Sequence, residues 1–558
     1  MIYCYLFEAK SIQQYLFRSG KLKDVIAASE RLDQLIDSNE TSVLNHVLRN
    51  AQLSSDLLDS IQAESSDCIH FLRCKGGAFY SYCEKEAPLL ALRSLWTLTV
   101  QQLFPSLDFT DALTGKATLI DALDMAHQQL ATDRNSPIIK FPIANTISER
   151  YQRSGKVAVP SSIKGQENNL DLDTDNHRHA YESQDMKHAA ALQNRFTPES
   201  LRGKIHYPVD IENEFQKSPK ANASNQVATR DIALIHIDGN GLGILLMGLK
   251  DALKGKTTAE YQYAFREFSQ ALNTATEKAA QKATQWLAEN ATYEYKGKSF
   301  LPMRPIVLGG DDLTLLCRAD LALDFSQIFC IEFKKESEIA LKAVSEKYNL
   351  PTYLTASGGI LYNKAGHPFT NSLHLVEALC AHAKKLTKSV ATIEHPVGPA
   401  ALAFYRISNT VSTSFTAAFK QSQQFLLADN NSIDMGASAY FVEDNYSNSL
   451  HNLTAIAKLC REKNAVISMA KWRQMATLLA QGDLAEAKAL FNRATSLVTD
   501  TRSITSLTEK LNTLLGCTQG NGWYVKEGEQ LHCIINDLLI VDHFRPVLPD
   551  EIKGENNE

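Results

Sequence analysis

The sequence predicts an α+β protein with two ferredoxin-like domains, the first of them degenerate, followed by a mainly helical C-terminal domain. Strand-like apolar runs and helix-like apolar spacings alternate in the same order twice along the chain. Both copies contain an apolar hairpin around a Gly-Gly pair, at residues 76–77 and 309–310. Residues 450–497 differ, because Ala and Leu recur there at helical spacing. The predicted parts are residues 1–135, 136–230, 231–395 and 396–558.

Length and composition indicate a globular protein of several domains. A chain of 558 residues is long enough for three or four domains, and 44% hydrophobic with 22% charged residues is ordinary for such proteins. The net charge of -6 does not indicate nucleic-acid binding, although a local basic face stays possible. The ten cysteines include no Cys-x-x-Cys pair, as expected of buried thiols in a reducing compartment. Because no leader-like segment or bilayer-length apolar run is present, we expect a cytoplasmic protein with no membrane partner.

The first copy, residues 1–135, has a hairpin without acidic residues. The turn is Gly76-Gly77-Ala78-Phe79, so this copy cannot hold a metal ion as an acidic hairpin would. We interpret it as a degenerate internal repeat; the alternative is that two common ferredoxin-like folds share a hairpin by chance. The predicted elements are strands at 2–7, 68–72 and 80–83 and helices at 11–36, 90–104 and 119–130.

Residues 136–230 are predicted to connect the two copies. Residues 168–188 are polar, acidic and nearly free of apolar side chains, which favours a mobile surface insertion. His177, His179 and His188 could be metal ligands, but no cysteine or fixed framework accompanies them. A solvated loop is the preferred interpretation.

The second copy, residues 231–395, has the pattern β-α-β-β-α-β of a palm-type fold. In this topology the first strand lies beside the hairpin strands, so the end of the first strand and the hairpin tip meet. The predicted elements are strands at 232–237, 306–308, 313–316 and 353–361 and helices at 265–286, 323–347 and 375–386. The C-terminal part, residues 396–558, is predicted to form a helical bundle without catalytic residues of its own.

Three aspartates at these turns form the candidate site: Asp238 ends the first strand, and Asp311 and Asp312 lie at the hairpin tip. Two carboxylates at a buried tip repel each other and are costly to desolvate, and a divalent cation would compensate both effects. Oxygen ligands from two strands suit a pair of Mg²⁺ or Mn²⁺ ions in phosphoryl transfer. We expect Asp238 and Asp312 to bridge the metals and Asp311 to serve the second metal or the attacking hydroxyl. The alternative is an ordinary structural turn, since Asp and Gly are common in turns.

Neighbouring residues are candidates for nucleotide binding. Glycines let a nucleotide approach the backbone, and their amides can contact phosphate; the alternative is a simple turn from loop to helix. Paired lysines on the last helix could reach phosphates, although such pairs are more often solvated. The candidates are Gly239, Asn240, Gly241, Gly243, Gly309, Gly310, Lys384 and Lys385.

These motifs resemble the large palm subunit of type III CRISPR effector complexes, which makes cyclic oligoadenylates. The resemblance is carried by residues 238–243, the hairpin 309–312, residues 357–360 and Ala383-Lys384-Lys385. Residues 12–16, 21–24 and 27–29 resemble the degenerate first palm of that family. The resemblance covers most of the chain, with the acidic motifs as its specific part.

The resemblance implies an ATP-using, metal-dependent nucleotidyltransferase in antiviral defence, with ATP, other effector subunits and guide or target RNA as partners. Two departures from the family are expected: the first palm starts at residue 1 without a preceding HD nuclease domain, and residues 149–158 lack the cysteines of a zinc module. We therefore expect no structural zinc, and either a guide-RNA complex or a derived, standalone system.

Other functions stay open. A cyclic-dinucleotide synthase is an alternative, since GGDEF-type cyclases share the palm and similar acidic turns. A non-catalytic scaffold that binds RNA or protein partners is another, and the loss of acids in the first palm favours it. A template-dependent polymerase is disfavoured because the sequence shows no thumb-and-fingers organisation.

Overall fold

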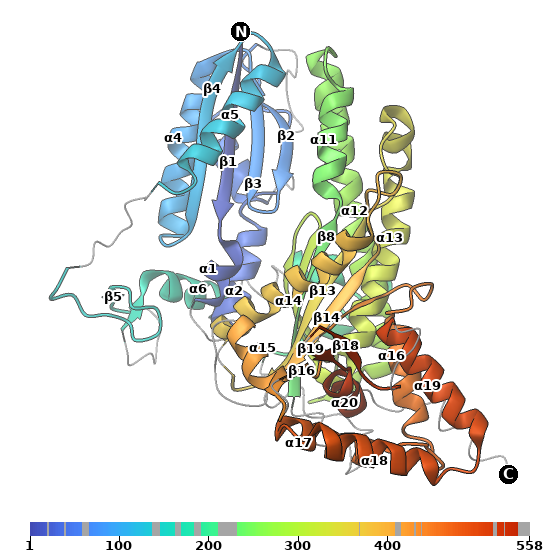
Figure 1. Ribbon diagram of the computed structural model, residues 1–558. Helices are drawn as coiled ribbons and strands as arrows, with labels where there is room; N and C mark the ends of the chain where they lie inside the picture. Colours follow the sequence, from blue (N-terminus) through green and yellow to red (C-terminus); the bar gives the residue numbers. More distant parts are fainter. Residues whose placement is uncertain are drawn as a thin grey trace.

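The structure is a computed structural model that describes most of the chain (Figure 1). The described residues are 1–18, 22–37, 41–57, 66–136, 145–161, 169–182, 191–209, 231–367, 369–407, 415–428, 431–436, 438–516, 522–528 and 530–544. None of the helices among these residues is both long and apolar enough to cross a membrane.

The first domain contains an antiparallel sheet in the ferredoxin-like order β2-β3-β1-β4. Helix α4 covers one face, where Trp96 packs edge to face against Phe7 and Phe79 in the core. Helix α5 covers the other face. The elements are β1 (Ile2–Lys10), α1 (Ile12–Phe17), α2 (Leu22–Asp33), α3 (Val43–Asn50), β2 (His70–Lys75), β3 (Ala78–Cys83), α4 (Glu86–Leu103), β4 (Asp108–Lys116) and α5 (Leu119–Asp133).

The second domain repeats this order as β11-β12-β8-β13, which confirms the prediction of ferredoxin-like palm folds. Two further strands, β14 and β17, extend the sheet beyond β13. The elements are β8 (Asp231–Asn240), α11 (Leu242–Ala252), α12 (Thr258–Ala291), β11 (Met303–Leu308), β12 (Asp312–Arg318), α13 (Ala319–Tyr348), β13 (Thr355–Lys364), α14 (Phe369–Val390), β14 (Ala401–Arg406) and β17 (Ala439–Phe441).

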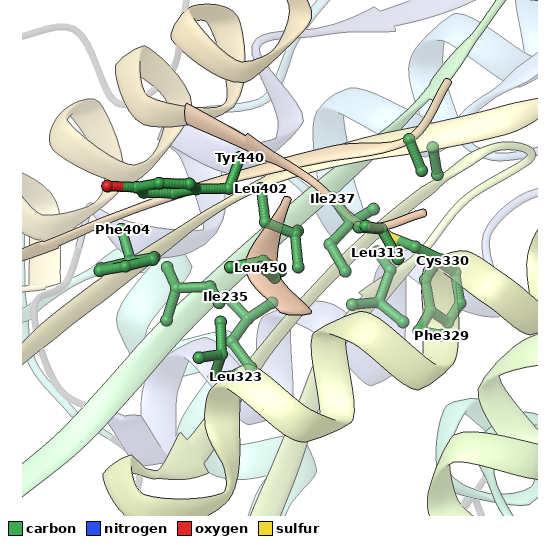
Figure 2. Close-up of a cluster of buried hydrophobic side chains, with 14 of the residues drawn as sticks. Ile235, Ile237, Leu313, Leu323, Phe329, Cys330, Leu402, Phe404, Tyr440 and Leu450 are labelled. Carbon is green, nitrogen blue, oxygen red and sulfur yellow. The ribbon is translucent and has the colours of Figure 1, made fainter. Parts of the chain in front are cut away.

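Strand β8 is buried along nearly its whole length because helices cover both faces of its sheet. Ile235 and Ile237 point toward α13, where Leu323 and Phe329 lie in the same core (Figure 2). Leu234, on the opposite face, belongs to the core that includes residues of α14. This burial on both faces fixes the register of β8, and therefore fixes where Asp238 lies at its end.

The two palms share one apolar core. Leu6 and Leu72 of the first domain cluster with Tyr261 and Phe268 of α12. Ion pairs join the domains as well, for example between Arg266 of α12 and Asp56 of the first domain. The first domain is therefore held against the second by apolar and charged contacts together.

Both hairpins contain an irregularity near the turn. Strand pairing shifts between Phe71 and Arg73 in the first hairpin and between Pro305 and Val307 in the second. A shared bulge at a similar place supports the interpretation of the two palms as an internal repeat.

The expectation of a solvated loop at 168–188 is wrong for residues 169–182. These form β6 (Leu170–Asp171) and α6 (Leu172–Glu182), and α6 packs on α2. His177 is 4% exposed and contacts the Tyr15 hydroxyl and Arg31. Polar residues are buried here because charged partners satisfy them, a pattern that hydrophobicity does not reveal. His179 is exposed, and His188 lies outside the described residues.

The remaining connector elements are short. They are β5 (Ala158–Val159), α8 (Ala191–Phe196), η1 (Glu199–Leu201) and β7 (Ile205–His206), and β7 pairs with β10 (Lys298–Phe300), which pairs with β9 (Tyr293–Tyr295). Residues 210–230 lie outside the described part.

The C-terminal part begins within the second palm, since β14 and β17 belong to its sheet. The predicted division at residue 396 therefore falls inside this domain, between α14 and β14, which is the next strand of the sheet. A small sheet in the order β15-β16-β19-β18 was also not expected. The elements are α15 (Phe415–Gln423), β15 (Gln424–Leu426), β16 (Ser432–Asp434), α16 (Leu450–Leu459), α17 (Met469–Ala480), α18 (Leu484–Ser496), α19 (Thr501–Leu515), β18 (Val525–Glu527), β19 (Gln530–His532) and α20 (Ile535–Phe544).

Candidate active site

The two acidic turns meet where β8 ends and β12 begins. Asp312 lies directly opposite Asp238 in the antiparallel pair of these strands. Residues opposite each other in such a pair project to the same face of the sheet, so both carboxylates share one side. Asp311 joins them from the hairpin tip, because its side chain packs against Gly239. The structure therefore brings together the three aspartates that the sequence singled out.

Two glycines make room for these carboxylates. A Cβ added to Gly309 would stand 1.6 Å from an oxygen of Asp312, and one added to Gly239 would stand 2.8 Å from Asp311. The backbone amide of Gly309 also donates to the carbonyl of Asp312, at 2.8 Å, which closes the turn. The space that these glycines leave is filled by aspartate side chains.

Burial and mutual repulsion raise the pKa values of the hairpin carboxyl groups. Desolvation, followed by the charges of Asp238 and Asp312, raises the pKa of Asp311 to about 7. Desolvation and the charge of Asp238 raise the pKa of Asp312 to about 6. Holding these acids together is unfavourable for the protein alone, as expected of a site built for a positively charged group.

Lys384 of α14 is part of the site, and Lys385 is not. The ammonium group of Lys384 forms an ion pair with Asp238 and donates to the carbonyl of Gly239 at 2.9 Å. Lys385 is exposed on the next position of the helix. Of the two lysines, only Lys384 is placed to reach a nucleotide beside the aspartates.

The residues after Asp238 have structural roles. The amide nitrogen of Asn240 donates to the hydroxyls of Thr355 and Ser357, at 3.0 and 2.9 Å, so its side chain is directed into β13. Gly241 precedes α11 with φ of 88°, and a Cβ there would stand 2.7 Å from Val397. Gly243 lies in the first turn of α11, with no neighbour within 4 Å of an added Cβ.

A cavity of about 320 Å³ opens onto the aspartates, and the first domain lines part of it. Gln13, Arg73 and Gly76 come from the first domain, and His236 comes from β8. His236 accepts or donates a hydrogen bond with Thr314 at 3.0 Å, and burial lowers its pKa to about 4. The sequence analysis noted Gln13 and Gly76 only as parts of first-palm motifs, and it missed Arg73 and His236, because the only signal for Arg73 was its position three residues before Gly76.

A second, larger cavity of about 1040 Å³ lies between the two palms. The first hairpin, α5, α8, α11 and α12 line it, and it shares Arg73, Gly310 and Asp311 with the smaller cavity. The carbonyl of Gly310 is fixed by the Thr276 hydroxyl of α12, at 2.6 Å. The acidic hairpin is thus exposed to both cavities.

The carboxylate oxygens of the three aspartates are suitable ligands for a divalent cation. Carboxylate oxygens are the preferred ligands of Mg²⁺ and Mn²⁺, and a cation would relieve the repulsion that raises the pKa values of Asp311 and Asp312. In the described part of the chain, no three His, Cys, Asp or Glu side chains are arranged to hold a metal ion as they stand. At Asp238 a cation would compete with Lys384, which occupies that carboxylate.

Residues 231–391 match the protein family described as Cas10/Cmr2, second palm domain. The match spans β8 to α14 and includes the acidic turns and Lys384. The chain therefore contains a palm domain of the Cas10/Cmr2 type, which confirms the predicted similarity to the large palm subunit of type III CRISPR effector complexes.

Solved structures of Csm1 are similar over nearly the whole chain, at low sequence identity. Csm1 of T. onnurineus has 12% identity and a TM-score of 0.47, with 98% of this chain and 70% of that chain covered. A Csm1–Csm4 cassette in complex with cA3 gives the same four values. A Csm1–Csm4 cassette in complex with cA4 has 11% identity and a TM-score of 0.46, with 97% and 70% covered. We found no match among curated protein sequences.

Proposed function

We propose that the chain is a metal-dependent nucleotidyltransferase that converts ATP to a cyclic oligoadenylate-type second messenger in type III CRISPR or a derived antiviral defence. The observation that carries this proposal is the pairing of Asp238 with Asp312, with Asp311 beside them, in a palm domain of the Cas10/Cmr2 type. Raised pKa values for both hairpin aspartates support a site built around positive charge.

The proposed reaction is phosphoryl transfer between nucleotides. A ribose hydroxyl attacks the α-phosphorus of ATP, a new O–P bond forms, and the bond to the bridging oxygen breaks. Pyrophosphate leaves with that oxygen, and the hydroxyl proton is released to solvent. Asp238, Asp311 and Asp312 would hold Mg²⁺ or Mn²⁺, which when bound lowers the pKa of the hydroxyl and neutralises charge on the phosphates.

Lys384 has two roles in this proposal. Without a nucleotide its ammonium group neutralises Asp238, as the ion pair shows. When a cation takes over that carboxylate, the same ammonium group is free to contact a phosphate oxygen. Gly310 keeps the hairpin backbone open to the nucleotide, while Gly309 and Gly239 make room for Asp312 and Asp311.

The proposed partners follow the family of the second palm. ATP is the proposed substrate, and other type III effector subunits with guide or target RNA are the proposed assembly. Among the solved structures, Csm1–Csm4 cassettes contain Csm4 as a subunit, and one is in complex with one ATP.

The test is chromatography of products after the purified chain is incubated with labelled ATP and Mg²⁺ or Mn²⁺. We expect a cyclic adenylate from the parent and from Asp251→Ala, which alters an exposed ion pair on α11. We expect none from Asp311→Ala/Asp312→Ala, because two of the three metal ligands are removed.

The length of the product distinguishes a cyclic oligomer from a cyclic dinucleotide. Equal products from the parent and the double variant would overturn the assignment of these aspartates. If the parent shows neither turnover nor metal-dependent ATP binding, the nucleotidyltransferase proposal fails and the scaffold alternative gains.

A further inference from the structure

Arg73 is placed where the first domain faces the acidic hairpin of the second. It lies on β2, three residues before Gly76 at the hairpin turn. It lines both the cavity above the aspartates and the larger cavity between the palms, and in both it is accompanied by Gly310 and Asp311. A residue common to both cavities lies at the junction that a nucleotide beside Asp311 would occupy.

The irregularity in the first hairpin determines which way Arg73 projects. With the shift between Phe71 and Arg73, Arg73 lies opposite Tyr80. Continued regular pairing from Phe71 and Ser81 would place it opposite Phe79, on the face that packs against Trp96 of α4. The extra residue therefore moves the guanidinium from an apolar core to the face that meets the second palm.

The two cations of β2 are used differently. Lys75 forms ion pairs with Glu277 at 3.2 Å and Asp37 at 3.6 Å, so its charge is neutralised by structural partners. Arg73 stacks over the Tyr80 ring, 5.7 Å from its centroid, and forms no ion pair with a carboxylate among the residues described. Its guanidinium instead lines both cavities together with Gly310 and Asp311.

A guanidinium in this position suits a phosphate group. Its fixed fork of N–H donors binds two phosphate oxygens at once, and its charge offsets the negative charge that develops on leaving pyrophosphate. The first hairpin has Ala78 and Phe79 where the second has Asp311 and Asp312, so it brings a cation and no carboxylate to the shared space.

We propose that Arg73 is a catalytic residue that the degenerate first palm supplies to the second, where it binds the triphosphate of the nucleotide held beside Asp238, Asp311 and Asp312. This inference rests on the proposed function, and it gives the first palm a direct chemical role. The carboxylates and the phosphate-binding arginine are thereby divided between two domains.

The test compares binding of labelled ATP and AMP, with Mg²⁺ present, to the full chain and to Arg73→Ala, Arg73→Lys and Arg93→Ala. Arg93 is the matched control, because it pairs with Asp111 at 2.7 Å in the same domain, away from both cavities. We expect Arg73→Ala to weaken ATP binding roughly 10- to 100-fold, the loss expected for hydrogen bonds to a charged group. AMP binding should change little, Arg73→Lys should be intermediate, and Arg93→Ala should bind as the parent does.

The outcomes separate this inference from the proposed function. If the parent makes cyclic product and Arg73→Ala keeps the parent's ratio of ATP to AMP affinity, the role of Arg73 is overturned. The same holds if both affinities fall together with the melting temperature, since that indicates a structural role. If the parent binds ATP but the purified chain forms no product, a selective loss of ATP binding in Arg73→Ala still supports the phosphate contact. A parent that binds neither nucleotide overturns both.

Discussion

At the scale of single residues, the acidic hairpin shows that two neighbouring glycines differ in what they permit. A Cβ at Gly309 would overlap Asp312, whereas the nearest atom to a Cβ at Gly310 is a methyl group of Leu272 at 3.6 Å. Neither glycine has a positive φ among the residues described, so backbone strain does not distinguish them. The difference lies in the carboxylate that needs the space.

We therefore expect Gly309→Ala to displace the Asp312 carboxylate and to reduce ATP turnover by about 100-fold, the cost of moving a catalytic group by about 1 Å. Gly310→Ala is the matched control and should keep most of the activity, since 3.6 Å is an ordinary contact. Initial rates and melting temperatures of both variants are the measurement. Equal rates would show that Asp312 is not held where the structure places it.

Glu30 of α2 is a buried acid that lowers the stability of the fold by an amount that depends on pH. It is 2% exposed and accepts a hydrogen bond from the amide of Leu192 at 3.3 Å. Burial raises its pKa to about 7, with Asp33 adding to the shift and Arg304, Leu192 and Gln193 opposing it. The folded protein thus keeps this proton to a higher pH than the unfolded chain does, so folding loses stability between about pH 4.5 and 7.

We expect Glu30→Gln to remove this loss. The variant should match the stability of the parent below about pH 4.5 and exceed it above pH 7 by up to about 3 kcal/mol, because folding raises the pKa of Glu30 from 4.5 to about 7. Melting curves between pH 4.5 and 8 provide the measurement, with Glu338→Gln on the exposed face of α13 as control. A stability difference that does not grow with pH would contradict the assignment.

At the scale of elements, the sequence predicted the strands and turns that a local pattern of residue types marks. Strand β8 and the acidic hairpin were predictable because continuous apolar runs end at glycine and aspartate, and the ferredoxin-like order then brings Asp238 and Asp312 together. The placement of Arg73 was not, because it depends on a bulge that no residue type marks. Helix α6 was missed for another reason: its buried side chains are polar and are satisfied by distant residues such as Tyr15 and Arg31.

Helix α6 offers a direct comparison of two histidines. His177 lies 2.9 Å from the Tyr15 hydroxyl and 2.7 Å from Arg31, and burial holds its pKa well below the usual value. We expect His177→Ala to cost about 1–3 kcal/mol, because both partners stay buried without it. His179→Ala, at an exposed position on the same helix, should change stability by no more than about 0.5 kcal/mol. Denaturant unfolding measures both, and similar small effects would favour the solvated loop after all.

At the scale of the whole molecule, the site depends on how the two palms are held together. The shared core contains apolar residues from both sheets, and the cavity above the aspartates has walls from both domains. A charged network lies at the border of the larger cavity: Arg195 of α8 contacts Asp33 at 2.5 Å and Glu277 of α12 at 2.6 Å. Lys75 of the first hairpin joins the same network through Glu277. One arginine thus links the connector, the first palm and the second.

Removing that arginine should weaken the association of the palms. Arg195→Ala leaves Asp33 and Glu277 with Lys75 as a nearby cation, and breaking a fully buried pair costs about 3–5 kcal/mol. We expect a loss of about 2–4 kcal/mol in the free energy of unfolding, because the side chains of Arg195, Asp33 and Glu277 are still 11%, 15% and 24% exposed. Lys254→Ala is the control, since Lys254 pairs with Asp251 at 2.8 Å where the two side chains are 68% and 69% exposed, and its loss should cost no more than about 0.5 kcal/mol.

The same variant tests whether the first palm contributes to the site. If Arg73 acts from the first domain, removing the ion pairs of Arg195 that hold the two palms together should weaken ATP binding in Arg195→Ala at temperatures where the chain is still folded. Arg73→Ala/Arg195→Ala should then bind ATP no more weakly than Arg73→Ala, because the contact between Arg73 and the triphosphate, which the ion pairs of Arg195 help to position, is already lost. Isotherms for the three variants and the parent give the coupling. Fully additive losses of ATP affinity would mean that the ion pairs of Arg195 support only the fold and that Arg73 acts independently of them.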